Sequence, residues 1–436
     1  MRRLLMAVAM TLTAVAAPAQ AKASHPALAP LDGLMPDLEK LYLDLHQSPE
    51  LSQHEEKTSA KMADRLRALG YEVTTGFGGY GVVGILRNGK GPTVMIRTDL
   101  DALPVEEKTG APYASKVRTK DDAGNDVAVM HACGHDTHMT SWVGAGTLLA
   151  RGKDKWRGMV MMIGQPDEEK DSGARAMLKA GLFTKFQKPD FAIAMHDSAD
   201  MPAGIVGVTA GYVLANVDSV DLTIVGRGGH GAYPYKTVDP VVIAARTILA
   251  LQTIASRENN PLDPVVITVG SIHGGTKHNI IPDEVKLQLT VRSYKDDVRK
   301  RLIDSITRIA KAEAAAAGAP REPRITLLTG DSSTYNDPAL AKRLVEVFRR
   351  SFGSDRVTEP QPVMASEDFS EYGRAGVPAL LVWVGGVNPA KYQAAKVAGT
   401  PLPSLHSSEW LPDYSPTIRM GASSLTLAAL ELLGRP

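Results

Sequence analysis

The stretch MHACGHDTH, residues 130–138, contains the residues of this chain whose types and spacing most clearly indicate chemistry. It places Cys133, the only cysteine among 436 residues, between His131, His135 and His138. Three roles are open for this thiol: a packed core side chain, a nucleophile, or one ligand of a metal site. Cys133 and His135 are two residues apart, and on an extended loop such side chains share a face and can bind one ion.

A pair of acidic residues, Glu168 and Glu169, follows the apolar run GMVMMIG in the segment QPDEE. Taken alone, such a pair is more often part of a solvated acidic loop. In a buried cleft, however, two adjacent carboxylates do not both ionise comfortably without a nearby cation. A metal ion resolves this conflict if it binds one carboxylate and leaves the other as a general base with a useful pKa.

Two further histidines follow strand-like runs: His196 ends FAIAMH, and His406 lies in PSLHSSEW. Either one alone is more often a core residue than a ligand. We expect all of these groups to end separate strands at one edge of one sheet, where α/β proteins bind ligands. A thiolate, carboxylates and three imidazoles suit zinc, manganese or cobalt better than calcium or magnesium. Charge counting favours two divalent ions, because the thiolate of Cys133 and the carboxylate of Glu169 neutralise only part of their charge.

The elements that must position these groups follow an α/β pattern over residues 24–211 and again over 327–436. Apolar residues at helical spacing predict two helices between Leu34 and Leu69, and Gly70 ends the second. Strand-like and helical segments then alternate, which indicates a sheet with helices on both faces. The predicted strands are GVVGILRN, PTVMIRTD, GMVMMIGQ, FAIAMH and PALLVWVGG, and the predicted helices are SWVGAGTLLARG, GARAMLKAG, PALAKRLVEVFRRSF and SPTIRMGASSLTLAALELLG.

Residues 212–326 follow a different pattern and form a predicted insertion. A strand (VDSVDLTIVG) is followed by a helix (residues 239–258), two strands (DPVVITVGSI and EVKLQLTVRS), a second helix (296–318) and a last strand (PRITLLTG). The order β-α-β-β-α-β is the split βαβ plan of ferredoxin-like domains. The α/β domain is therefore predicted to be discontinuous in sequence.

Residues 1–23 resemble a cleavable signal peptide, with Arg2 and Arg3 before an apolar run to Ala17 and an A-x-A pattern that ends at Ala23. The run is too short for a stable membrane anchor, and no later run of about 18 apolar residues occurs. We expect a periplasmic or secreted protein without a membrane anchor after processing. In an oxidising compartment Cys133 must then be buried or held as a metal-bound thiolate.

The charge balance excludes some partners. The net charge is +1, from 49 basic and 48 acidic residues, and 44% of the residues are hydrophobic. This composition gives no indication of binding to nucleic acid or to an anionic membrane surface.

The motifs together resemble the amidohydrolase branch of the aminoacylase and carboxypeptidase metallopeptidases, which includes hippurate hydrolases and indole-acetyl-amino-acid hydrolases. The matching stretches are LHQSPELSQHEEKT, IRTDLDALPVEEKTG, MHACGHDTHM, QPDEEKDSGA, GRGGHGAYP, HNIIPD, MASEDFS and LHSSEW, and they run through nearly the whole mature chain. The resemblance implies an α/β fold: a mixed-sheet catalytic domain with an inserted ferredoxin-like α+β domain that serves as lid and dimerisation surface.

The resemblance also implies roles for individual residues. Glu168 becomes the general base, and Asp101 a carboxylate that orients a ligand from behind. The implied ligands of two divalent ions, with zinc, manganese or cobalt expected, are Cys133, His135, Glu169, His196 and His406.

Three residues of the inserted domain are implied as substrate contacts. His230 follows a strand in a glycine-rich turn and is expected to contact the substrate or its oxyanion, including the site of a partner subunit. Asn279 and Arg292 are candidates for holding the polar end of the substrate, because an arginine can bind a carboxylate through two hydrogen bonds.

The chain departs from this family pattern at three places. Asp167 stands where a small residue is common, Asp197 follows a predicted ligand where a less polar residue is common, and residues 116–129 are longer than expected. The stretch DDAGND within that segment is typical of a hairpin tip. These departures leave the metal site intact but prevent transfer of an acyl-group preference.

The main prediction is hydrolysis of the amide bond of an N-acyl-amino acid or small peptide by a metal-activated water with a glutamate base. An exported dipeptidase or carboxypeptidase with the same binuclear centre is the nearest alternative. An amidase with Cys133 as nucleophile and His135 as base is a second, and it leaves Glu169, His196 and His406 without a role. A non-catalytic binding protein is a third.

Overall fold

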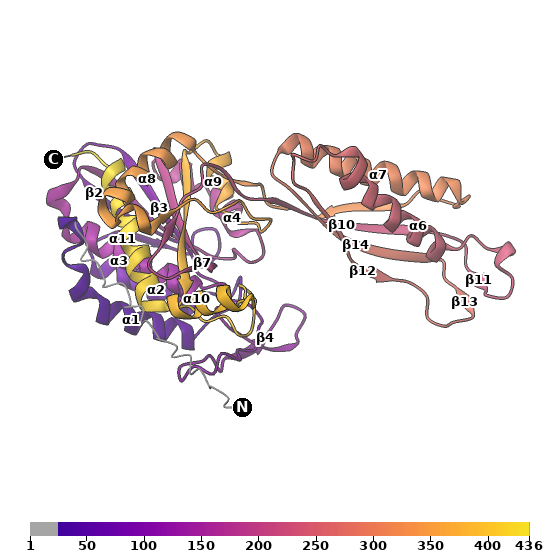
Figure 1. The fold of residues 1–436 in the computed structure, drawn as a ribbon, viewed down its shortest axis with the longest axis horizontal. Coiled ribbons are helices and arrows are strands. Elements are labelled where there is room, and N and C mark those ends of the chain that lie inside the picture. Colours follow the sequence, from indigo (N-terminus) through magenta and orange to yellow (C-terminus); the bar gives the residue numbers. More distant parts are fainter. Residues whose placement is uncertain (1–24, 329, 436) are drawn as a thin grey trace, which may run out of the picture.

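The computed structural model of this protein describes residues 25–328 and 330–435, so the predicted signal peptide lies outside the described residues. The chain forms two parts (Figure 1): a large α/β part that contains both ends of the described chain, and a smaller part joined to it by extended segments. Among the described residues, no helix is both long enough and apolar enough to cross a membrane.

An eight-stranded mixed sheet forms the centre of the large part. Its order is β1-β2-β6-β3-β7-β18-β8-β17. Four neighbouring strands run parallel to one another: β6, β3, β7 and β18. The antiparallel pairs of the sheet are β1 with β2, β2 with β6, and β18 with β8. The bounds are β1 Glu72–Thr75, β2 Val82–Asn88, β6 Gly158–Gln165, β3 Thr93–Asp99, β7 Phe191–Pro202, β18 Ala379–Val387, β8 Val206–Gly207 and β17 Val357–Thr358.

Each face of this sheet carries its own buried core. Successive strand side chains point to opposite faces, so Val94 and Ile96 of β3 belong to one core and Met95 to the other. Helices α1, α2, α3, α8 and α11 contribute to the first core, and α4, α5 and α9 to the second. The bounds are α1 Leu31–Gln47, α2 Glu56–Ala68, α3 His135–Arg151, α4 Gly173–Lys179, α5 Leu182–Lys185, α8 Pro338–Phe352, α9 Ser370–Arg374 and α11 Tyr414–Leu432.

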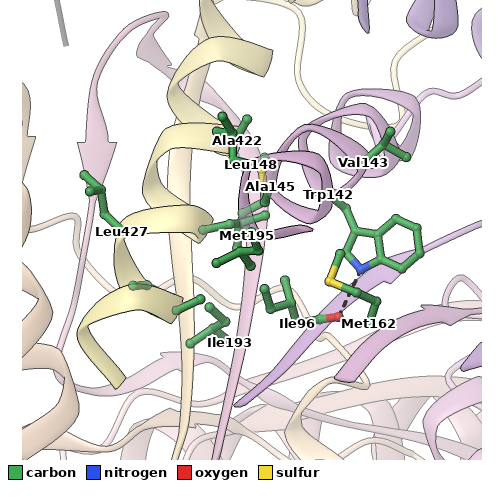
Figure 2. Close-up of a cluster of buried hydrophobic side chains, with 14 of the residues drawn as sticks. Ile96, Trp142, Val143, Ala145, Leu148, Met162, Ile193, Met195, Ala422 and Leu427 are labelled. Atoms are coloured by element: carbon green, nitrogen blue, oxygen red, sulfur yellow. Dashed lines mark hydrogen bonds between the residues drawn. The ribbon is translucent and has the colours of Figure 1, made fainter. Parts of the chain in front are cut away.

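Figure 2 shows the first core between α3, α11 and the sheet. Trp142 of α3 is fully buried, and its indole Nε1 donates a hydrogen bond to the carbonyl oxygen of Ile96 at 3.0 Å. A buried indole needs such a partner, and here the partner belongs to the central strand β3. The contact holds the first turns of α3, and therefore His135, beside the end of β3.

The small part has the predicted β-α-β-β-α-β order. Its four strands form an antiparallel sheet in the order β12-β14-β10-β15, with one face covered by α6 and α7. The bounds are β10 Asn216–Val225, α6 Pro240–Thr253, β12 Val266–His273, β14 Glu284–Ser293, α7 Asp296–Ala316 and β15 Arg324–Leu328. The strands of this sheet thus lie between Asn216 and Leu328, close to the predicted insertion at 212–326; the domain boundaries themselves stay a prediction.

Some predicted elements have different bounds in the structure. The helix predicted over 239–258 is α-helical only to Thr253 and continues as the π-helical segment η4. The helix predicted from Ser141 begins six residues earlier, at His135. The remaining elements are η1 Pro26–Leu28, β4 Arg118–Lys120, β5 Asp126–Ala128, η2 Lys153–Lys155, β9 Gly211–Leu214, β11 Gly229–His230, η3 Pro234–Lys236, η4 Ile254–Glu258, β13 Ile280–Ile281, β16 Thr334–Asn336, η5 Ser354–Arg356 and α10 Pro389–Ala398.

A buried histidine ties α1 to α3. His46 at the end of α1 is 1% exposed, and its Nδ1 and Nε2 lie 2.6 Å from Asp136 Oδ2 and 3.3 Å from Glu107 Oε1. Burial by itself lowers the pKa of His46, but the hydrogen bonds to the two carboxylates outweigh it and raise the pKa to about 9.

We predict that protonated His46 stabilises the fold in a pH-dependent way. Because its folded pKa is raised above the unfolded value, the contribution is complete below about pH 6.5 and is lost as the pH rises through about 9. Denaturant unfolding of wild type and His46→Gln should therefore differ by up to about 3 kcal/mol at pH 6 and converge above pH 9. His54→Gln, whose side chain is 54% exposed, is the control and should follow wild type. A pH-independent difference would contradict the prediction.

Candidate metal centre

The turn that carries Cys133 and His135 brings both side chains inward, although not as the sequence predicted. Gly134 adopts a left-handed conformation with φ 79°, and His135 is the first residue of α3 rather than part of an extended loop. The prediction that an extended backbone aligns the pair was wrong, since a sharp turn does so. Cys133 is 6% exposed and His135 is fully buried.

His196 lies inside β7 rather than at its end, because the strand continues to Pro202. Pairing of β7 with β3 stops earlier, at Arg97 and Ala194, so on that side the backbone of His196 is not paired with β3. Its Nδ1 donates to the carbonyl oxygen of Asp197 at 2.7 Å. This bond leaves Nε2 free, 3.5 Å from Cys133 Sγ.

His406 reaches the same point from a loop after α10, which also differs from the predicted strand end. Its backbone has φ 66°, and its amide donates to the carbonyl oxygen of Ala132 at 2.8 Å. Nε2 lies 3.3 Å from Cys133 Sγ and 3.5 Å from Glu169 Oε2. The side chain is 56% exposed, so His406 is the most open member of the cluster.

The two glutamates lie where the sequence predicted, in the turn directly after β6. His135 Nε2 is 3.8 Å from Glu168 Oε2 and 3.8 Å from Glu169 Oε1. Burial raises the pKa of Glu169 to about 8, with His135 acting against it. Burial and the carboxylate of Glu367 raise the pKa of Glu168 well above its usual range. Two largely buried carboxylates therefore lie close together, which is the situation that a cation relieves.

Asp101 contacts both His135 and the backbone of Glu169. The carbonyl oxygen of Asp101 accepts a hydrogen bond from His135 Nδ1 at 2.8 Å, and its carboxylate lies 3.4 Å from the same nitrogen. The carboxylate also accepts from the amide of Glu169 at 2.9 Å and from Ser52 Oγ at 2.7 Å. The orienting contact to His135 is thus shorter through the main chain than through the predicted carboxylate.

Buried atoms without hydrogen-bond partners show that the cluster fits metal ions. His135 Nε2 and Glu169 Oε1 are both buried and unpartnered. The ligand atoms of Cys133, His135 and His196 lie within 4.8 Å of one another, and so do those of Cys133, Glu169 and His406. A thiol, imidazoles and a carboxylate at such spacing are the ligands that zinc and similar ions take.

The same geometry disfavours a cysteine nucleophile. Burial, with the carboxylates of Glu169 and Glu168, raises the pKa of Cys133 well above its usual range, whereas a nucleophilic cysteine needs a lowered pKa. The hydrogen-bond contacts of Sγ are with His196 and His406, and not with the predicted base His135.

The three predicted substrate contacts do not join this cluster in the same chain. His230 in β11 and Asn279 just before β13 are exposed and lie at the far end of the small part (Figure 1). Arg292 at the end of β14 lies at the junction of the two parts, where Nη1 donates to the carbonyl oxygen of Met364 at 2.8 Å.

Two of the departures from the family pattern lie at the edge of the cluster. Asp167 has φ 60°, a conformation that aspartate tolerates better than most residues. Its carboxylate accepts from Gln53 Nε2 at 3.0 Å and from Ser172, which fixes the turn before Glu168. The predicted hairpin of residues 116–129 is present as β4 and β5, and Asp122 at its tip pairs with Lys170 at 2.6 Å.

A buried network around Arg97 was not predicted from the sequence. Arg97 is 1% exposed and donates to Asp99, Glu367 and Asp368, each at 2.8 Å. An arginine inside the apolar run PTVMIRTD was the signal available for this network, since a buried charge must be paired. Its partners at 367 and 368 are far away in sequence and could not be assigned from spacing.

The mixed sheet brings a thiol, three imidazoles and a pair of carboxylates to one buried point. This arrangement is typical of a metal-dependent hydrolase. Residues 95–400 match the model of Peptidase family M20/M25/M40, and the chain belongs to this family. Relatives of this chain are named as carboxypeptidase, deacetylase and hippurate hydrolase, enzymes of amide or peptide bonds, so the predicted family and enzyme class are confirmed.

The chain is similar to several curated relatives over most of its length. Thermostable carboxypeptidase 2 of Saccharolobus solfataricus is 34% identical over 391 residues, which is 89% of this chain and 93% of that protein. Hippurate hydrolase of Campylobacter jejuni is 36% identical over 341 residues, 77% and 85% of the two chains. N-acetyl-L-cysteine deacetylase of Bacillus subtilis is 35% identical over 329 residues, 75% of each chain.

Solved structures confirm the predicted fold class. A proposed aminohydrolase from methicillin-resistant Staphylococcus aureus has a TM-score of 0.81 at 28% identity, covering 92% of this chain and 98% of that chain. The YXEP protein of Bacillus subtilis, described as a dinuclear metal binding peptidase, has a TM-score of 0.74 at 28% identity, covering 92% and 100%.

We predict that Gly134→Ala weakens metal binding by at least about tenfold. An added Cβ would lie 2.1 Å from Asp197 Oδ2, and φ 79° is strained for alanine, so the turn between Cys133 and His135 must shift. Competition with a chromophoric chelator measures the change. Gly110→Ala is the matched control, because φ is 73° but nothing lies within 4 Å, so only backbone strain is added. Equal metal affinities of the two variants would contradict the prediction.

Proposed function

We propose that this protein hydrolyses the amide bond of N-acyl-amino acids or small peptides. Two divalent ions, with zinc, manganese or cobalt expected, would be held by Cys133, His135, Glu169, His196 and His406. The observation that carries the proposal is the burial of two adjacent carboxylates, Glu168 and Glu169, beside unpartnered ligand atoms. The printed names of hippurate hydrolase and N-acetyl-L-cysteine deacetylase support the substrate class.

Cys133 is common to both groups of ligand atoms, one with His135 and His196 and one with Glu169 and His406. Its Sγ therefore lies close to the ligand atoms of His135, His196, Glu169 and His406, which would hold the ions together with it. When bound, divalent ions polarise a carbonyl group and lower the pKa of water, so that a nucleophile is available near neutral pH.

Glu168 is assigned the proton transfers. It takes a proton from water as the water oxygen attacks the carbonyl carbon, and it gives that proton to the amine nitrogen as the C–N bond breaks. Burial and Glu367 raise the pKa of Glu168, which suits a carboxyl group that must hold a proton between the two steps. Glu168 lies 3.8 Å from His135 Nε2 and next to Glu169, so it is adjacent to the ligands without being needed as one.

A carboxypeptidase or dipeptidase activity is the second candidate. It is favoured by the similarity to thermostable carboxypeptidase 2, which covers 89% of this chain. Both activities use the same centre and differ in whether the amine end of the substrate is blocked by an acyl group.

We predict that hydrolysis of an N-acyl-amino acid panel or a dipeptide panel is lost on chelation and restored by zinc, manganese or cobalt. Glu168→Gln should lower kcat by roughly 10²–10⁴-fold, because the base is removed while the ligands remain. Glu56→Gln is the matched control, since Glu56 also belongs to a pair of adjacent glutamates, with the buried Glu55, but is itself exposed. The preferred panel separates amidase from peptidase.

Two outcomes would contradict this assignment. Activity that survives thorough chelation would exclude the metal mechanism and favour the alternative in which Cys133 is the nucleophile. Wild-type protein that binds two ions yet hydrolyses neither panel would favour a binding protein.

We also propose a homodimer through the small part, in which His230 and Asn279 serve the site of the partner subunit. Both residues are exposed and remote from the metal centre of their own chain. Strand β12 pairs on one side only, and Val242, Leu249 and Ile272 nearby are 56%, 72% and 53% exposed. An edge strand and exposed apolar side chains of this kind are suited to a symmetric contact between copies.

The dimer is tested by mixing two inactive variants, Glu168→Gln and His230→Ala. In a mixed dimer, one site combines an intact Glu168 with His230 from the other chain, so random exchange should restore roughly a quarter of wild-type activity. If His230 served its own chain, no mixed site would be complete and no activity would return. A monomer at micromolar concentration in sedimentation would also contradict the proposal.

A further inference from the structure

His138, the third histidine of the motif, lies in the first turn of α3 and is not one of the assigned ligands. It is 1% exposed and lies between two strands that carry or adjoin the metal centre. Its ring is 4.5 Å from the ring of His196 and 5.2 Å from the ring of His135, measured between centroids. His138 therefore packs against the rings of both His135 and His196.

One ring nitrogen of His138 holds the end of β3. Nδ1 lies 2.8 Å from Asp99 Oδ1, and the other oxygen of Asp99 accepts from Arg97 Nη1 at 2.8 Å. That second oxygen is also 3.8 Å from His135 Nε2, the nitrogen that is free for an ion. The orientation of Asp99 thus sets where a negative charge lies relative to His135.

The other ring nitrogen holds β7 directly after a ligand. The amide of Asp197 donates to His138 Nε2 at 2.9 Å, so Nε2 is the acceptor and the ring proton on Nδ1 points to Asp99. The carbonyl oxygen of the same residue, Asp197, accepts from His196 Nδ1 and so orients the ring of that ligand. His138 thus holds the peptide group before the Cα atom of Asp197, and His196 is held by the peptide group after it.

Asp197 adds a contact that depends on this chain's own sequence. Its buried carboxylate lies 3.3 Å from His138 Nε2, 3.5 Å from His196 Nδ1 and 3.3 Å from Thr137 Oγ1. It also lies against Gly134, between the two first ligands. The residue that departs from the family pattern is therefore packed against the supports of Cys133, His135 and His196 together.

We propose that His138 is a positioning residue for both histidine ligands: it holds the carboxylate of Asp99, which faces His135 Nε2, and the backbone of Asp197, whose carbonyl oxygen orients His196. The inference rests on the proposed binuclear centre and deepens it. Because the imidazole contacts both supports at once, moving one support moves the other. Hydrogen-bonded supports behind metal ligands affect affinity by about 10–100-fold.

Two substitutions separate the two contacts. The amide nitrogen of His138→Asn can occupy the position of Nδ1 and still donate to Asp99, but it does not reach Asp197. The longer side chain of His138→Gln can accept from the Asp197 amide, but it loses the donor to Asp99. Thr147→Val is the matched control, because this buried hydroxyl of the same helix only donates to the carbonyl oxygen of Val143.

The test measures the two dissociation constants for zinc by competition with a chromophoric chelator, and the unfolding midpoint of the metal-free protein. We expect each His138 variant to weaken zinc binding by about 10–100-fold, with the two variants differing in which of the two dissociation constants rises further. Thr147→Val should keep both constants. Having two variants keeps the inference testable if one of them does not fold.

The inference is overturned if both His138 variants keep the wild-type constants, or if they only lower the unfolding midpoint, as a purely structural histidine would. Wild-type protein that binds no zinc overturns it together with the proposed centre. Wild-type protein that binds two zinc ions but hydrolyses no substrate overturns the proposed function alone, while the constants of the variants still decide the role of His138.

Discussion

The burial of several carboxylates away from water is the constraint on which the rest of this structure depends. Glu168 and Glu169 are buried beside one another, and further carboxylates on β3 and in the segment 367–368 lie behind them. Ionised carboxylates in such a place cost several kcal/mol each unless a positive charge compensates them. Arg97 and the imidazoles supply part of that charge, and the unpartnered ligand atoms mark where the remainder belongs.

The surrounding fold is organised to hold these charges still. Parallel strands β3, β6 and β7 bring Asp99, Glu168 and His196 to one edge, and the buried indole of Trp142 fixes α3 against them. Two of the proposed ligands have a support that points them inward: the carbonyl oxygen of Asp101 for His135 and the carbonyl oxygen of Asp197 for His196. A metal site requires ligand side chains that are held rigidly by hydrogen bonds from neighbouring residues.

Sequence predicted the parts of this arrangement that follow from local pattern. Apolar runs gave the strands, periodicity gave the long helices, and the β-α-β-β-α-β order gave the small part, because each is decided within a few tens of residues. The cluster itself was found from residue types, but the geometry of its members was not. His135 begins a helix, His196 lies within a strand and His406 lies in a loop, since tertiary contacts decide these positions. Glu367 and Asp368 lie in the matching stretch MASEDFS, but their pairing with Arg97, 270 and 271 residues away, could not be predicted from local spacing.

The distance along the chain between Cys133 and His406, 273 residues, has a consequence for biogenesis. At typical synthesis rates of about 5–20 residues per second, the thiol emerges on the order of 10–60 s before the histidine that lies against it. The whole small part is made in that interval. A centre that needs both residues is therefore a product of the finished chain, and its assembly reports that the two halves of the large sheet have met.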